Sequence, residues 1–215
     1  MFPNAAKGVK KIFIAEILAL ISSVLAIIAI VLGVVGIAAT AAESAGGALA
    51  SFGGAGLFLI IGGIFLIIAF ILELVGIINA SKDESAFKIA LYAVIVCIVI
   101  SVVSTIFSST AAVVNICDIL YKIAKVVVTV FIIQGIINLA TKVNNTEVAN
   151  KGKNLLYIIA CIYILSAIAS VVVAIFGGYA ASAVAGVIAI AAAVLDVVQY
   201  VLFLVLLAKT KKMLA

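Results

Sequence analysis

The chain has 215 residues, of which 68% are hydrophobic and only 10% are charged. Typical soluble proteins have ~45–50% apolar and ~25% charged residues, so this composition excludes a soluble globular protein. We therefore predict an all-α, polytopic integral membrane protein. The net charge of +5 rests on 13 lysines without arginine or histidine, a usage that favours an AT-rich bacterial genome. These lysines gather at the ends of apolar runs and form no basic face, so no nucleic-acid partner is expected.

The first apolar run follows Lys7, Lys10 and Lys11, a layout also found in secretory signals. A signal has an apolar region of only ~7–15 residues, whereas this run extends over residues 12–42. We interpret it as an uncleaved transmembrane helix.

Five more runs follow the first. A helix needs ~20 apolar residues to cross ~30 Å of hydrocarbon, and six segments of the chain meet this length. We place these helices at about residues 12–39, 57–79, 87–108, 114–140, 154–176 and 184–208. The prediction is a bundle of six transmembrane helices in a single transmembrane domain, residues 1–215, without a soluble domain. The glycine-rich segment 41–56 is interpreted as a flexible cap or a re-entrant turn.

Lysine placement predicts the orientation of the bundle. Eleven of the 13 lysines lie at the two termini or in the segments 80–88 and 141–153. Lys122 and Lys125 are the two on the opposite side. Because lysine is enriched on the cytoplasmic side, both termini are predicted to be cytoplasmic, in a cell membrane.

A short motif occurs twice, as Gly76-Ile77-Ile78-Asn79 and as Gly135-Ile136-Ile137-Asn138. Each copy ends an apolar run and is followed by a polar segment with lysine. We interpret the motif as part of an internal repeat that makes three helical hairpins. The alternative is coincidence in a chain filled with four apolar residue types.

Small residues at helical spacing predict where helices meet, because they allow close backbone approach. Glu16, Glu73 and Asp196 each lie on such a stripe and are therefore expected to face other helices. The stripes are Ala19, Ser23, Ala26 and Gly33; Gly62, Ala69, Gly76 and Ala80; Ala90, Ala93, Cys97, Ser101, Ser104 and Ser108; Tyr163, Ser166 and Ser170; and Ala185, Ala189, Ala192 and Gln199.

The acids are candidates for an ion or proton path. At 1.5 Å per residue, Glu16 and Glu73 lie roughly 8–9 Å inside the cytoplasmic boundary, at one level if their helices pair. They either share a proton or a cation, or reach water and neighbouring lysines. Asp196 lies near mid-membrane. An acid at that depth either has a function or, when protonated, donates a hydrogen bond that holds two helices together. Gln199 follows one turn later.

A polar stripe marks the outer half of the fourth helix and consists of Asn115, Asp118, Lys122, Lys125 and Thr129. It indicates either a water-filled vestibule or lysines that reach outward to the interface. The complete set of candidate path residues is Glu16, Glu73, Asn115, Asp118, Lys122, Lys125, Asp196 and Gln199.

The sequence contains no recognisable catalytic, metal-binding or phosphate-loop motif, so we expect neither an enzyme nor a cofactor or metal. Cys97, Cys117 and Cys161 lack the spacing of metal ligands. The leading hypothesis is a transporter- or channel-like protein for a small cation or proton. The alternative is a non-catalytic accessory subunit that binds a partner protein, toxin or lipid. Expected partners are the bilayer and a second copy or another membrane subunit.

Overall fold

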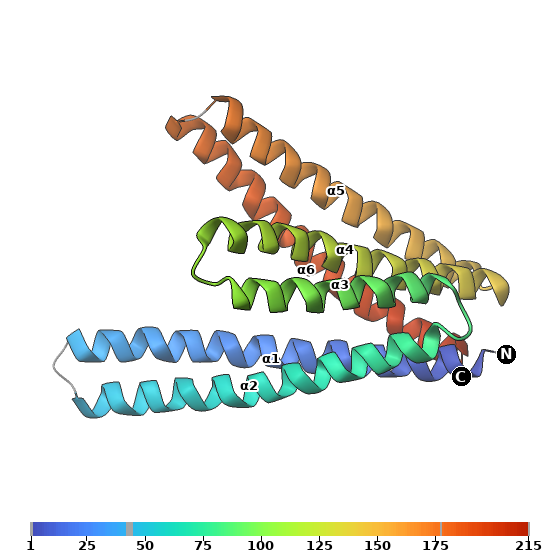
Figure 1. Ribbon diagram of the computed structural model, residues 1–215, viewed down its shortest axis with the longest axis horizontal. Helices are drawn as coiled ribbons and strands as arrows, with labels where there is room; N and C mark the ends of the chain where they lie inside the picture. The colour runs from blue at the N-terminus through green and yellow to red at the C-terminus, as the bar shows by residue number, and fades with distance from the viewer. Residues whose placement is uncertain (1, 42–44, 177, 215) are drawn as a thin grey trace. The chain divides into compact units, whose positions relative to one another are not determined.

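The computed structural model describes residues 2–41, 45–176 and 178–214, with side chains for residues 2–38, 53–110, 112–165 and 194–214. Within these ranges the secondary structure is six helices and no sheet (Figure 1). The helices are α1 (Pro3–Ala41), α2 (Ala45–Ala80), α3 (Ala86–Ile106), α4 (Ala111–Lys142), α5 (Thr146–Phe176) and α6 (Gly178–Leu214).

Five helices among the described residues are long and apolar enough to cross a membrane. The candidate spans are Pro3–Ala38, Gly53–Ala80, Ala86–Ile106, Ala112–Lys142 and Thr146–Leu165. The predicted all-helical membrane class is therefore supported. The internal repeat, the orientation of the termini and the single domain remain predictions.

Three helices, α1, α2 and α5, begin eight or more residues before their predicted positions. Proline at the first position fits α1, since its missing N–H would have no partner there. Helix α2 begins at Ala45, so residues 45–56 are helical despite their glycines and form neither a loop nor a turn. Glycine costs a helix only ~1 kcal/mol per residue, and neighbouring apolar turns offset that. Residues 42–44 lie outside the described part.

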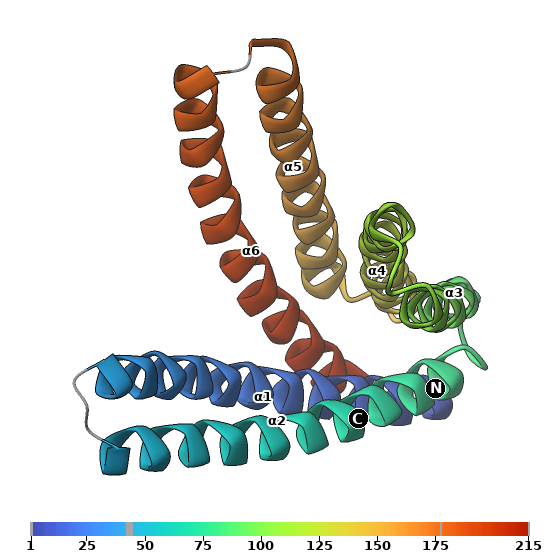
Figure 2. The ribbon, with the colours of Figure 1, turned by 60° about the vertical axis from the view of Figure 1, so that its left-hand side comes forward.

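The chain divides into two compact units, residues 10–76 and residues 1–9 with 77–215. The first unit is the antiparallel hairpin of α1 and α2 (Figures 1 and 2). Its buried small residues repeat every seven positions, as Ala15, Ser22, Ala29 and Gly36 in α1 and Ala55, Gly62, Ala69 and Gly76 in α2. Ser22 Oγ donates a 2.8 Å hydrogen bond to the carbonyl of Gly62. The hairpin thus packs along two matched seams of small side chains.

The seam on α1 differs from the predicted stripe. Ala19, Ala26 and Gly33 are only partly buried, and Ser23 is exposed. At 3.6 residues per turn, the two stripes are separated by roughly 60° around the helix. Both stripes of α1 contain small residues. The stripe that packs against α2 is the one whose seven-residue repeat matches that of α2.

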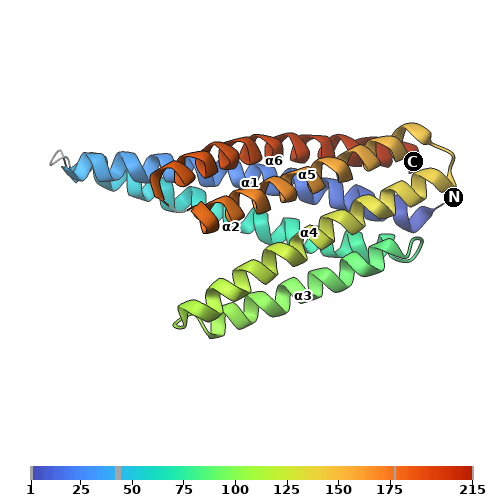
Figure 3. The ribbon, with the colours of Figure 1, turned by 90° about the horizontal axis from the view of Figure 1, so that it is seen from above.

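The second unit is organised around α4, which packs against α3 and α5 and touches α6 (Figure 3). Its repeated motif, Gly135–Asn138, lies in the most buried part of the helix. A Cβ on Gly135 would come within 2.5 Å of the ring of Phe87, which is fully buried. Glycine therefore makes room for the aromatic ring of α3. Of the stripe predicted for α3, Ala90, Ala93 and Cys97 are buried, as expected. The second half of the stripe is not, because Ser104 is only partly buried and Ser101 and Ser108 are exposed.

A tight turn joins α4 to α5. Asn144 has a φ of 56°, a left-handed conformation that asparagine tolerates well. Asn145 N–H bonds the carbonyl of Ala140 at 2.8 Å, and Asn144 N–H bonds that of Thr141 at 3.1 Å. These bonds satisfy carbonyls at the end of α4. Asn145 Oδ1 then accepts from the N–H of Val148 at 3.1 Å and caps α5.

Helix α6 returns alongside α5 (Figures 1 and 2). Glu147, near the start of α5, pairs with Lys209 near the end of α6. It also lies 3.0 Å from Lys151, one turn further along α5. The predicted stripes at Ser166 and Ser170 and at Ala185, Ala189 and Ala192 lie outside the described side chains.

Candidate functional site

A pocket of about 270 Å³ is formed by residues of α4, α5 and α6, all within the second unit. Three of the eight predicted path residues line it: Lys122 and Lys125 from α4, and Gln199 from α6. We call it the lysine pocket. Its described lining consists of Tyr121, Lys122, Lys125, Val126, Thr129, Ile159, Tyr163 and Gln199.

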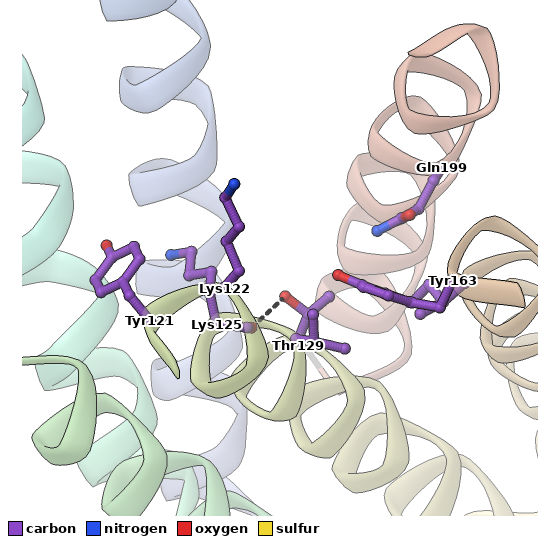
Figure 4. A pocket seen from close by; sticks show the side chains of 8 residues that line it. Tyr121, Lys122, Lys125, Thr129, Tyr163 and Gln199 are labelled. Atoms are coloured by element: carbon purple, nitrogen blue, oxygen red, sulfur yellow. Dashed lines mark hydrogen bonds between the residues drawn. The ribbon is translucent and has the colours of Figure 1, made fainter. Parts of the chain in front are cut away.

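Helix geometry explains why these side chains meet. Lys122, Lys125 and Thr129 are three and four residues apart, so they share one face of α4. Tyr163 and Gln199 point from α5 and α6 toward that face (Figure 4). Thr129 Oγ1 donates to the carbonyl of Lys125 at 3.2 Å, which holds the threonine hydroxyl against its own helix. The pocket thus takes polar side chains from all three helices, together with the apolar side chains of Val126 and Ile159.

The depth of the pocket follows from the length of α4. Lys122 precedes Lys142, the last residue of this helix, by 20 positions. That separation is about 30 Å along the helix axis, equal to the thickness of the hydrocarbon layer. If Lys142 lies at one membrane surface, the ammonium groups of the lysine pocket therefore lie near the opposite surface.

Asp118 lies outside the lysine pocket. It lines a neighbouring pocket of about 250 Å³ between α3 and α4, together with Ser101, Ser104 and Tyr121. Tyr121 borders both pockets, whereas Asn115 is exposed. The predicted polar stripe is thus divided, because α3 packs beside one part of it and α5 beside the other.

Asp196 is exposed and is not among the described residues that line the lysine pocket. It lies close enough to Tyr163 for an electrostatic interaction. Gln199, one turn along α6, reaches the pocket itself. The Asp196 carboxylate therefore lies near Tyr163, one of the residues that line the pocket.

Glu16 and Glu73 belong to the α1–α2 hairpin, where both are partly buried and each makes an interaction. The bond between Ser22 and Gly62 sets the register of the two helices. In that register Glu73 lies level with Lys11, and about 7–8 Å along the axis from Glu16. The hairpin therefore staggers the two carboxylates, which the sequence had placed at one level.

One buried ionic cluster was missed in the sequence. Glu84, in the turn between α2 and α3, is only 5% exposed. It accepts hydrogen bonds from Lys142 Nζ at 2.6 Å and Asn138 Nδ2 at 2.9 Å. Gln134 Nε2 in turn donates to Asn138 Oδ1 at 2.9 Å. The sequence feature that could have predicted this cluster is the spacing of Gln134, Asn138 and Lys142, which places three polar groups on one face of an apolar helix.

The neighbouring carboxylate attaches the start of the chain to the same turn. Asp83 accepts hydrogen bonds from Asn4 Nδ2 at 3.0 Å and from the backbone N–H of Ala5 at 2.8 Å. It thus satisfies an N–H in the first turn of α1, which has no acceptor within the helix. Lys142 also lies 5.7 Å from the ring centroid of Phe2, within cation–π range. These contacts join residues 2–5 to the end of α4.

The ionic cluster predicts a loss of stability in acid. Burial opposes ionisation of Glu84, but hydrogen bonds from Lys142 and Asn138 outweigh it, so its pKa lies below the ordinary value of 4.5. A carboxyl group whose pKa is lower in the folded state than in the unfolded state stabilises the fold above pH 4.5. This stability is lost as the pH falls through the pKa of the folded state. We expect unfolding curves between pH 7 and pH 3 to show a smaller loss for Glu84→Gln than for the wild type. Parallel curves would contradict this.

No metal site is evident in the described part of the chain, where no three His, Cys, Asp or Glu side chains are placed to bind one ion. The thiols of Cys97 and Cys117 are buried and that of Cys161 is exposed, and none of the three forms a disulfide. The chain matches no protein-family model, no curated protein and no solved structure.

Proposed function

We propose that the protein is a transporter- or channel-like multi-pass membrane protein that moves a proton or small cation along a polar path between helices. The observation that carries this proposal is the lysine pocket, where polar side chains from three apolar helices face one another. Polar and ionisable groups inside a membrane bundle are costly and commonly mark ion or proton pathways. In this proposal the protein lies in a bacterial cell membrane with both termini cytoplasmic and has no enzymatic activity.

Of the two kinds of ion, the pocket favours the proton. Two ammonium groups repel a metal cation, and the repulsion is strong where water is scarce. A proton can instead hop between hydroxyl and carboxyl groups. Tyr163 and the nearby Asp196 supply one of each, and the Gln199 amide can orient them by hydrogen bonds. Asp196 is the group in this set that can bind and release a proton, so it has the central role.

Asp196→Asn tests the proposal because asparagine keeps the size and polarity of the side chain but cannot carry the proton. In proteoliposomes loaded with a pH-sensitive dye, wild-type protein is expected to dissipate an imposed pH gradient. The variant is expected to fall to the rate of protein-free vesicles while it retains its helical circular dichroism spectrum. Val197→Thr, at an exposed neighbour, controls for added polarity on α6. Equal rates for wild type and Asp196→Asn would rule out the proposed path.

A non-catalytic accessory role is the second candidate. The same lysine pocket supports it, because two cationic side chains can also bind an anionic partner. In such a protein Asp196→Asn would change stability more than ion movement.

A further inference from the structure

The lysine pocket has the chemistry of an anion site. Its described lining includes two ammonium groups and no carboxylate. The Gln199 amide and the hydroxyls of Tyr121 and Tyr163 add further hydrogen-bond donors. Lysine binds phosphate as a compact positive charge, and charge-assisted bonds from such groups are stronger than neutral ones. Asp118, the acid one turn from Lys122, lines the separate pocket beside α3.

The size and depth of the pocket restrict what it holds. A volume of about 270 Å³ is smaller than the ~300–1,000 Å³ typical of pockets for drug-sized ligands. It admits a polar headgroup but leaves acyl chains outside. If Lys142 lies at one membrane surface, Lys122 at about 30 Å and Lys125 at about 25 Å along α4 lie near the level of the opposite surface. Phospholipid phosphates are concentrated at that level, and tyrosine is enriched there as well.

We propose that the lysine pocket binds the phosphate of an anionic phospholipid headgroup. Lys122 and Lys125 hold the phosphate oxygens, and Gln199 and Tyr163 donate hydrogen bonds from the opposite side. The acyl chains remain in the bilayer. This site goes beyond the proposed ion path, since binding at it requires no ion movement. Inorganic phosphate has the same anionic chemistry, so it is the alternative source of the ligand.

Native mass spectrometry of the full-length protein, titrated with phosphatidylglycerol in detergent, measures the affinity of this site for the lipid. An ion pair between one exposed lysine and the lipid phosphate contributes up to ~1 kcal/mol, a factor of about five in affinity. We expect Lys122→Gln or Lys125→Gln to weaken binding about fivefold and the double variant roughly 30-fold. Phosphatidylcholine, which has the phosphate without net charge, is expected to bind more weakly to the wild type.

The matched control is the double variant Lys88→Gln/Lys153→Gln, which removes two exposed lysines outside the pocket. It is expected to retain wild-type affinity. Equal losses in both double variants would overturn the site, since the effect would then be one of net charge alone. Saturable binding of inorganic phosphate that displaces the lipid would overturn the lipid assignment. If the wild-type protein binds the lipid but shows no proton flux in proteoliposomes, the proposed function is contradicted and the lipid site remains supported.

Discussion

Gly135→Ala is expected to destabilise the protein by about 2 kcal/mol, although alanine is the better helix former. Overpacking a dense core typically costs ~1–3 kcal/mol. Here the new Cβ would meet three ring atoms of Phe87, at 2.5–2.8 Å. The ring is rigid and fully buried, so it has no free space to move into. The gain in helix propensity of up to ~1 kcal/mol offsets only part of this cost.

The free energy of unfolding in mixed micelles, followed by circular dichroism during titration with a denaturing detergent, measures this effect. Gly63→Ala is the matched control, because no atom lies within 4 Å of a Cβ at Gly63. It is expected to be neutral or stabilising. Phe87→Leu should reduce the penalty of Gly135→Ala in the double variant by about 1 kcal/mol, as residues in contact are coupled. If Gly135→Ala is as stable as Gly63→Ala, the ring does not occupy the glycine position.

Lys142→Met is expected to cost about 3 kcal/mol, because it leaves the Glu84 carboxylate buried without its cation. Glu84→Gln is expected to cost only about 1 kcal/mol. The difference arises from exposure. The Glu84 side chain is 4% exposed, whereas that of Lys142 is 48% exposed and can return to water when its partner is lost.

The double variant Lys142→Met/Glu84→Gln separates this explanation from a simple loss of packing. Removing the buried charge should restore about 2 kcal/mol relative to Lys142→Met alone, as expected for strongly coupled sites. The same unfolding titration provides the measurement, and Lys88→Met, at an exposed lysine of α3, serves as the control. A cost for Lys142→Met no larger than that for Lys88→Met would show that the ion pair contributes nothing.

The class of the protein follows from its sequence alone. With 68% hydrophobic and 10% charged residues, the chain cannot cover a soluble surface, and long apolar runs must satisfy their backbone hydrogen bonds as helices. The small-residue face of α2 was also predictable, since Gly62, Ala69, Gly76 and Ala80 are all buried. Composition and periodicity are properties of one helix, and they suffice for these conclusions.

Properties that depend on two helices came from the tertiary structure. The sequence offered two stripes of small residues on α1, and pairing with α2 selected Ala15, Ser22, Ala29 and Gly36. The stagger of Glu16 and Glu73 follows from the same register. Glu84 meets Asn138 and Lys142 across 54 and 58 residues of chain, a proximity that no local pattern encodes. The lysine pocket likewise requires α5 and α6 to bring Tyr163 and Gln199 to α4. Helix formation is local and can be read from periodicity, whereas register and side-chain juxtaposition depend on how separate helices pack.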